Sequence, residues 1–221
     1  MTPDLDRDGA CRLPGAAAAA LPAIEAALGG LPEERAGLRL HGRPDLTALL
    51  VPEGPIGAVV AQAVGRAMQP VRALLFDKSP GTNWSLGWHQ DRTIVVAQRI
   101  DTPGYGPWTI KQGLHHVEPP PELQAAMVTL RLHLDPVPAD NAPLLVVPGS
   151  HRRGRIAEAD IAAIVAQGTC HVCLAGRGDV WLYATPILHA SDAAARPARR
   201  RVLQVDYAAG ELPGGLRWLG V

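Results

Sequence analysis

The sequence predicts a mainly β fold, an antiparallel sandwich or barrel with helices near its N-terminus. Three observations favour this fold class. Helical patterns occupy the first part of the chain, short strand-like runs follow without βαβ alternation, and two of those runs alternate between apolar and polar side chains. Helices that precede a series of strands indicate such a fold rather than a doubly wound parallel sheet.

Each element follows from its local pattern. Residues 16–28 are rich in alanine and end at Gly29-Gly30, which commonly terminates a helix. Residues 55–68 begin with a proline that suits the first turn of a helix, and residues 158–168 form a shorter helical pattern. Seven short runs bounded by Gly, Pro and Asp have the composition of β-strands: 71–77, 93–99, 127–135, 143–148, 170–175, 179–184 and 201–208.

Length and composition fit one globular domain. The chain has 221 residues, of which 47% are hydrophobic and 19% are charged, so it is long enough to bury a core. We expect a single domain over residues 1–221. In this domain residues 1–70 supply helical support and residues 71–208 form the β core.

Charge and cysteine content exclude several classes of function. The formal net charge is zero, so nothing indicates a nucleic-acid-binding protein. No apolar run approaches the roughly 20 residues of a membrane span, so no membrane partner is expected. The three cysteines are an odd number, which argues against a disulfide framework and for a reducing, cytoplasmic location. Neither the charge nor the cysteine content indicates an oligomeric state.

Two strands have one apolar and one polar face, because successive side chains of a strand point to opposite sides. The polar face has two interpretations: it lies in water, or it lines a barrel that holds a polar ligand. In 127–135 the apolar face consists of Val128, Leu130, Leu132 and Leu134, and the polar face consists of Thr129, Arg131, His133 and Asp135. In 200–207 the apolar face consists of Leu203, Val205 and Tyr207, and the mainly polar face consists of Arg200, Val202, Gln204 and Asp206.

A histidine and an aspartate in "GWHQDRTIVV" could bind a metal ion. His89 and Asp91 are two residues apart, so on an extended chain both side chains leave the same face. The short motif alone is weak evidence. Two histidines and a carboxylate form the facial triad of non-haem Fe(II) oxygenases, and His189 at the end of a later strand is the candidate third ligand. One of the arginines at 199–201 could then bind a carboxylate.

At this point the chain resembles the phytanoyl-CoA dioxygenase family of Fe(II)/2-oxoglutarate-dependent oxygenases. The matching segments are "FDKSP", "WHQD", "NAPLLVVPGSHRRGR", "GDVWLY", "LHASD" and "RRVLQVDYA", which run in order from Phe76 to Tyr207. The combination is far more specific than any one segment. The resemblance implies a double-stranded β-helix, a jelly-roll or cupin-like core backed by the N-terminal helices.

The resemblance also implies roles for single residues. His89, Asp91 and His189 are expected to bind Fe(II). Arg200, with help from Ser191, is expected to bind the far carboxylate of 2-oxoglutarate, and Arg200 is preferred over its neighbours because it shares a face with Gln204 and Asp206. Arg131 is a further candidate for the cosubstrate or for an acidic group of the substrate.

The implied activity is a dioxygenase that uses Fe(II), 2-oxoglutarate and O₂. It would decarboxylate 2-oxoglutarate to succinate and CO₂ while it oxidises a small molecule, for which an anionic character is one option. Related halogenases lack the carboxylate ligand, so Asp91 favours hydroxylation. A cupin-like zinc hydrolase and a catalytically silent binding barrel are the alternatives.

Substrate contacts are sought near the predicted site. Residues 99–121 form a long irregular segment that could act as a lid loop. Trp108 and Lys111 on this segment and Trp88 beside His89 are candidates. Lys78 lies either at the mouth of the site or on an exposed loop. The same segment holds a possible rival metal site, formed by His115, His116 and Glu118.

Overall fold

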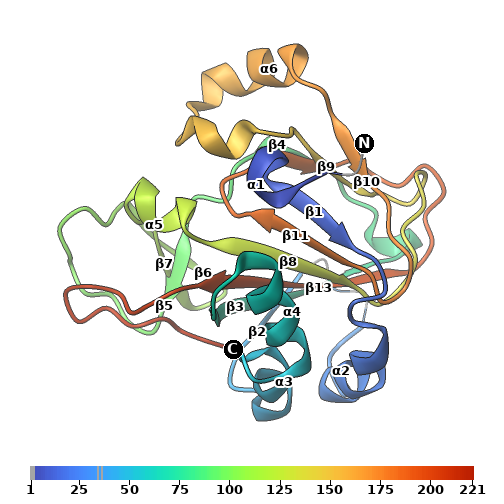
Figure 1. The fold of residues 1–221 in the computed structure, drawn as a ribbon, viewed down its shortest axis with the longest axis horizontal. Coiled ribbons are helices and arrows are strands. Elements are labelled where there is room, and N and C mark those ends of the chain that lie inside the picture. Colours follow the sequence, from blue (N-terminus) through green and yellow to red (C-terminus); the bar gives the residue numbers. More distant parts are fainter. Residues whose placement is uncertain (1–2, 34, 36) are drawn as a thin grey trace.

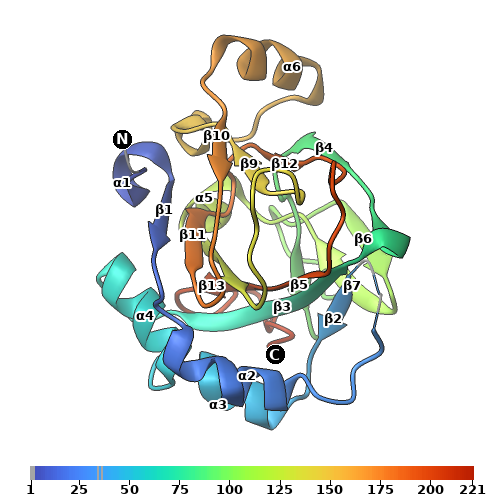
Figure 2. The same ribbon diagram turned by 90° about the vertical axis from the view of Figure 1, so that its right-hand side faces the viewer.

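Two antiparallel sheets face each other and enclose the interior of the protein (Figures 1 and 2). The computed structural model describes residues 3–33, 35 and 37–221. The larger sheet has the order β1 (Ala10–Leu13), β11 (Val180–Ala184), β8 (Val128–His133), β13 (Arg200–Ala208), β3 (Gln69–Lys78) and β2 (Leu38–Leu40). The smaller sheet has the order β10 (His171–Cys173), β9 (Leu144–Val146), β12 (His189–Ser191) and β4 (Leu86–His89). This arrangement confirms the predicted mainly β, jelly-roll fold.

Helices cover the outer face of the larger sheet. Figure 1 shows α2 (Leu21–Ala27), α3 (Pro44–Leu50) and α4 (Pro55–Val64) below this sheet, where their buried side chains join those of β8 and β13 in one apolar cluster. On the other side α6 (Glu158–Gln167) packs beside β4. The remaining helical turns are α1 (Leu5–Asp8), η1 (Ala18–Ala20), η2 (Pro80–Thr82), α5 (Pro121–Ala125) and η3 (Ser150–Arg153). The three helices expected from the sequence are confirmed.

Residues 1–70 supply two strands in addition to the expected helical support. β1 pairs with β11 and β2 pairs with β3, so this part of the chain extends the larger sheet at both edges. Both strands are short, with four and three residues. Their sequences, ACRL and LRL, are too brief for an alternating pattern to stand out, so pairing with long neighbours decides their conformation.

The segment 99–121 is also more ordered than a lid loop. It contains β6 (Trp108–Lys111) and β7 (Leu114–Val117), which form a hairpin that joins β5 (Ile94–Val96) in a third sheet. The two-residue turn at Gln112-Gly113 has φ values of 51° and 78°. Positive φ at both central residues is the geometry of the turns that favour tight hairpins.

The segment Pro44–Val64 is long and apolar enough to cross a membrane, by length and composition alone. This finding corrects the expectation that no apolar run approaches the length of a membrane span. Residues 51–54 divide it into α3 and α4, and Leu46, Leu50 and Ile56 are buried in the core beneath the larger sheet. We therefore interpret the segment as two core helices.

The alternation in β8 reflects a polar interior. All six residues of this strand are buried, so the face with Thr129, Arg131 and His133 does not lie in water. Leu130 and Leu132 on the opposite face pack in the cluster shared with the helices. The interpretation that the polar face lines the inside of the barrel is therefore correct.

Candidate metal centre

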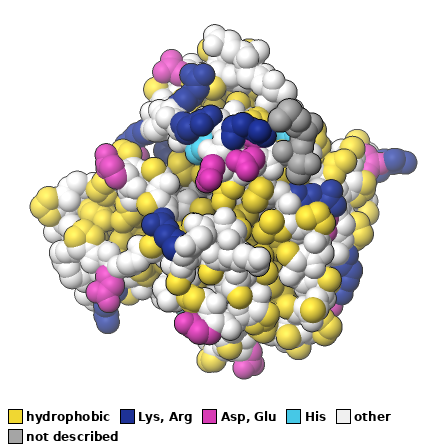
Figure 3. Space-filling view, in the orientation of Figure 1, with side chains coloured by type: hydrophobic (Ala, Val, Ile, Leu, Met, Phe, Trp, Pro, Cys, Tyr) yellow, Lys and Arg dark blue, Asp and Glu magenta, His cyan; other side chains and the backbone are white. Residues whose placement is uncertain are grey.

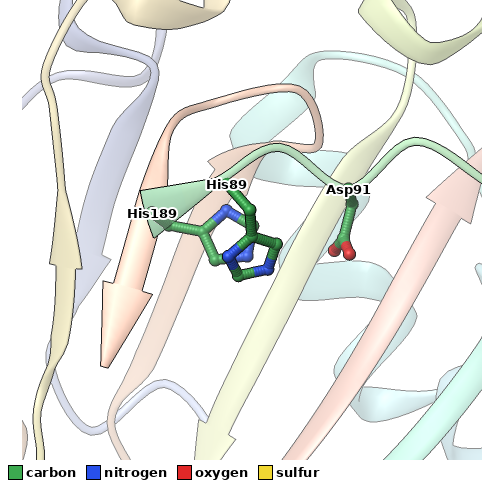
Figure 4. A group of neighbouring side chains, drawn as sticks. All are labelled: His89, Asp91 and His189. Carbon is green, nitrogen blue, oxygen red and sulfur yellow. The ribbon is translucent and has the colours of Figure 1, made fainter. Parts of the chain in front are cut away.

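Two histidines meet across neighbouring strands of the smaller sheet. His89 is the last residue of β4, His189 is the first residue of β12, and the two are direct cross-strand partners. The centroids of their rings are 4.2 Å apart. Asp91 follows β4, and Figure 4 shows its carboxylate on the same side of the chain as the two rings.

These three side chains have the geometry of a metal site. Their ligand atoms all lie within 4.8 Å of one another, so one ion could contact all three. Two imidazoles and one carboxylate are the donor set of non-haem iron sites that leave coordination positions open for other molecules. Within the described ranges of the chain, no other group of three histidine, cysteine or acidic side chains meets this condition.

The rival site at His115, His116 and Glu118 is therefore not formed. The two histidines are neighbours on β7, so their side chains point to opposite sides of the sheet. The carboxylate of Glu118 makes an ion pair with Arg155, with 2.5 Å between Oε1 and Nη1.

Hydrogen bonds orient both imidazole rings. Nδ1 of His89 lies 2.8 Å from the carbonyl oxygen of Gly87, and Nδ1 of His189 lies 2.9 Å from that of Ile187. A carbonyl oxygen only accepts, so each Nδ1 donates its proton there. Each Nε2 is then left with a free lone pair, which is the form that coordinates a metal.

The surroundings favour the protonation states that a metal needs. Burial lowers the pKa of His189 to about 4, so its ring is neutral near pH 7. Burial alone would raise the pKa of Asp91, but Arg72 and the two imidazoles outweigh this effect and lower it. The site therefore offers a neutral imidazole at His189 and a carboxylate at Asp91.

Arg72 on β3 connects the carboxylate to the barrel interior. Its Nε lies 2.6 Å from Oδ2 of Asp206 on β13, and its Nη2 lies 3.5 Å from Oδ2 of Asp91. Thr129 on β8 donates a hydrogen bond of 3.1 Å to the same Asp206. Contacts among β3, β13 and β8 thus position the guanidinium of Arg72, which in turn positions the carboxylate of Asp91.

A second buried group consists of basic side chains without acidic partners. Arg200 on β13 donates to the backbone carbonyl of Ala142, and Arg131 on β8 donates to Gln204 at 2.9 Å. In the part of the chain that the structure describes, neither guanidinium makes an ion pair, and the Nε atoms of both are buried without a hydrogen-bond partner. Burial and the charge of Arg131 lower the pKa of Arg200 to about 9.

Lys78 completes this cationic group, which contradicts its interpretation as an exposed loop lysine. It is the last residue of β3, is only 4% exposed, and has its Nζ 3.4 Å from Oγ of Ser191. A cavity of about 40 Å³ is lined by Lys78, Arg131, Ser191 and Arg200, together with Phe76, Trp84 and Leu86. A carboxylate group in this cavity would balance part of the buried positive charge.

The three adjacent arginines point in different directions. Arg201 faces outward, where it makes ion pairs with Asp135 and Glu25, and Arg199 makes ion pairs with Asp77 and Glu33. Arg200 is 2% exposed and lines the small cavity. The alternation of β13 therefore places Arg200 inside the barrel, as the sequence pattern predicts.

A cavity of about 800 Å³ opens beside the metal site. Of the predicted substrate contacts, Trp88 and Lys111 line it together with His89 and Asp91. Trp108 instead packs against the apolar cluster around β5 and β7, with Arg99 over its ring, and does not line this cavity. On β6 Trp108 and Lys111 have opposite parity, so the strand turns them to opposite sides.

Sequence reasoning missed three residues of this cavity: Arg39, which lines it from β2, and Arg72 and Phe76, which line it from β3. Gln204 of β13 and His116 of β7 also line it. Gln204 and the alternating face of β13 gave a usable signal. The three-residue strand β2 gave none, because only its pairing with β3 brings Arg39 to the interior.

Arg72→Gln is expected to weaken metal binding about 10- to 100-fold, because Asp91 loses the group that positions it. The measurement is the dissociation constant for Ni(II) or Fe(II) under anaerobic conditions. Arg39→Gln, on the neighbouring strand and without a contact to Asp91 in the described residues, is the control. The double variant Arg72→Gln, Asp206→Asn removes the unpaired buried carboxylate and should show the same weakening in a well-folded protein. Unchanged affinity in both Arg72 variants would contradict this role.

Known structures share the fold at low sequence identity. AviO1 from Streptomyces viridochromogenes Tue57 is 21% identical, with a TM-score of 0.64 over 95% of this chain and 93% of that one. EctD from S. alaskensis with 2-oxoglutarate and 5-hydroxyectoine is 18% identical, with a TM-score of 0.61 over 93% and 73%. The epimerase SnoN with Fe³⁺, alpha ketoglutarate and nogalamycin RO is 14% identical, with a TM-score of 0.62 over 96% and 88%.

A comparison with curated proteins finds no match. The family model of phytanoyl-CoA dioxygenase, by contrast, matches residues 5–202, which include the three candidate ligands and Arg200. Since this match covers most of the sequence, the chain belongs to the phytanoyl-CoA dioxygenase family.

Proposed function

We propose that this protein is an Fe(II)/2-oxoglutarate-dependent dioxygenase that hydroxylates a small molecule. Family membership supports an iron- and 2-oxoglutarate-dependent oxygenase, with O₂ as the oxidant. The observation that carries the proposal is the convergence of His89, Asp91 and His189 beside a buried cationic pocket. The proposal adds the residue roles and the hydroxylation outcome.

The three ligands would hold the iron. Because the three ligands lie on one side, a bound iron would remain accessible to 2-oxoglutarate and O₂. When bound, iron and 2-oxoglutarate supply the oxidative chemistry, in which 2-oxoglutarate is decarboxylated to succinate and CO₂. The chain itself fixes the two imidazoles through the carbonyls of Gly87 and Ile187 and fixes the carboxylate through Arg72.

The cationic pocket would hold the far carboxylate of 2-oxoglutarate. Arg200 offers a planar guanidinium that can bind a carboxylate through two parallel hydrogen bonds. Ser191 and Lys78 lie against the same small cavity, and Arg131 adds a second buried guanidinium. Binding of a dianion would compensate charges that the described part of the fold leaves without acidic partners.

Two observations favour this function over the alternatives. A zinc hydrolase with the same ligands has no need of a buried pocket with Arg131, Arg200 and Lys78. A silent binding barrel has no need of an intact metal-ligand set with both Nε2 atoms free. Asp91 occupies the position whose loss would open a coordination site for halide, so hydroxylation is the outcome that we propose.

The first test is the formation of succinate from 2-oxoglutarate. The protein with Fe(II) should produce succinate, and the protein with Zn(II) should not. His189→Ala should abolish both succinate formation and iron retention, because it removes one of the three ligands. His115→Ala, which changes a histidine of β7 outside the site, should do neither. Succinate formation that is independent of metal, or that survives in His189→Ala, would refute the proposal.

Arg200→Ala is expected to raise the KM for 2-oxoglutarate about 10- to 100-fold, because a charge-assisted pair with the far carboxylate is lost. Arg201→Ala is the matched control, because that side chain faces outward and pairs with Asp135. Steady-state kinetics with 2-oxoglutarate as the varied substrate check both variants. The opposite result, a silent Arg200→Ala and a raised KM in Arg201→Ala, would mean that the assigned faces of β13 are exchanged.

Affinity for 2-oxoglutarate should fall as the pH rises from 7 to 9. Burial, Arg200 and Arg131 lower the pKa of Lys78 to about 8, while Asp192 acts in the opposite direction. Above this pH the free protein loses the charge of Lys78, so the affinity for the dianion falls. Loss of one proton changes a binding constant by at most about tenfold per pH unit, so the affinity should fall by up to about tenfold by pH 9.

Isothermal titration of the Ni(II)-loaded protein at several pH values measures this dependence. Lys78→Met should bind 2-oxoglutarate more weakly at pH 7 and should show a flat profile. Lys111→Met, a lysine of the larger cavity, should keep the slope of the original protein. An unchanged slope in Lys78→Met would assign the titration to another group.

A further inference from the structure

We propose that the larger cavity binds a substrate that carries an oxyanion, a carboxylate or a phosphate, and that Arg39, Lys111 and His116 form the subsite for it. This inference deepens the proposed function and rests on it for the reacting end of the substrate. The anion subsite itself is argued from the walls of the cavity and needs no bound metal.

The cavity has unpaired positive charge. Four basic side chains line it: Arg39, Arg72, Arg92 and Lys111. Arg72 is neutralised by Asp206 and Asp91, and Arg92 lies 3.7 Å from Glu158 and donates to the carbonyl of Ile156. Within the described residues, Arg39 and Lys111 make no ion pair.

Arg39 is held toward the cavity by the pairing of β2 with β3. It lies opposite Leu74, and Arg72 is two residues from Leu74 on the same face, so the two arginines are diagonal neighbours. The Nε of Arg39 is buried without a hydrogen-bond partner in the described structure. Burial and the charge of Arg72 lower the pKa of Arg39, so an anion at this point would relieve an unfavourable environment.

His116 supplies an uncharged polar wall. It is fully buried on β7, its Nδ1 lies 3.4 Å from Oγ1 of Thr93, and its Nε2 has no partner among the described groups. Burial lowers its pKa to about 4, and the charges of Arg72, Lys111 and Arg39 act in the same direction. If the hydroxyl of Thr93 donates to Nδ1, Nε2 carries the proton and can donate to an oxyanion.

Acidic side chains do not compete for this subsite. Of the carboxylates that line the cavity, Asp91 belongs to the metal site, and Glu158 is 86% exposed beside Arg92. A volume of about 800 Å³ lies within the range of pockets that take ligands of drug size. The cavity can thus hold an anionic group near Arg39 while another part of the same molecule faces His89 and Asp91.

Matched pairs of probes test this inference by isothermal titration. The protein is loaded with Ni(II) and saturated with 2-oxoglutarate, so that the smaller cationic pocket is filled. The probes are 3-phenylpropanoate with its neutral amide, and phenyl phosphate with phenol. At least one oxyanion should bind ten times more tightly than its neutral partner, and the two pairs distinguish carboxylate from phosphate.

Variants then locate the preference. Arg39→Gln and Lys111→Gln should each reduce the preference for the oxyanion about tenfold, since each removes a charge-assisted contact. Arg92→Gln is the matched control in the same cavity, because its charge is already paired, and it should keep the preference. Titration with 2-oxoglutarate should give the parent affinity in all three variants, which shows that the fold is intact.

Equal affinity for acid and neutral probe, or no binding of either oxyanion, would overturn the inference. An equal loss of the oxyanion preference in Arg92→Gln and Arg39→Gln would also overturn it, because the overall positive charge of the cavity would then explain the preference without a specific subsite. The same titrations on metal-free protein separate this result from the proposed function. If the protein prefers the oxyanion probes in these titrations but forms no succinate, only the proposed oxygenase function is refuted. If the protein forms succinate but does not prefer the oxyanion probes, only the anion subsite is refuted.

Discussion

The pairing of β12 with β4 is the constraint on which the whole site depends. It sets His189 directly opposite His89, although 100 residues separate them in the sequence. Because Asp91 follows two residues after His89, the same pairing also brings the carboxylate to the two rings. The smaller sheet therefore builds the candidate metal site, while the larger sheet supplies the polar interior that surrounds it.

That interior is organised by charge. Placing ions inside a protein costs free energy unless they are paired and hydrogen-bonded. Arg72 forms ion pairs with Asp206 and Asp91, and these pairs position the carboxylate ligand. Arg131 and Arg200 do not satisfy this rule within the described chain, so the fold retains buried positive charge that a bound dianion would balance. On the face in Figure 3, basic side chains gather in the upper part of the molecule, with acidic side chains beside them.

The sequence predicted the parts of the site that depend on period-two alternation. The spacing of His89 and Asp91 and the faces of β13 follow from the geometry of a single strand, so Arg200 could be chosen over Arg199 and Arg201. Parts that depend on pairing with distant segments could not be predicted. β2 is too short to give a pattern, so the sequence does not predict Arg39, which reaches the interior through the pairing of β2 with β3.

Other differences have similarly local causes. Gln112-Gly113 is not the Asn-Gly or Asp-Gly signal of a tight hairpin, so the sequence predicts an irregular loop where the structure has the hairpin of β6 and β7. β3 continues to Lys78, one residue beyond the predicted strand, and this extra residue carries the lysine into the barrel. Trp108 and Lys111 lie on opposite sides of β6, and the sequence does not predict this strand, so it does not separate the two side chains.

The most direct test of the account is an iron anomalous difference map from crystals grown anaerobically with Fe(II). The account predicts one strong peak within bonding distance of Nε2 of His89, Nε2 of His189 and a carboxylate oxygen of Asp91. A peak that lies away from any one of these three side chains, or no peak at all under saturating Fe(II), would contradict it.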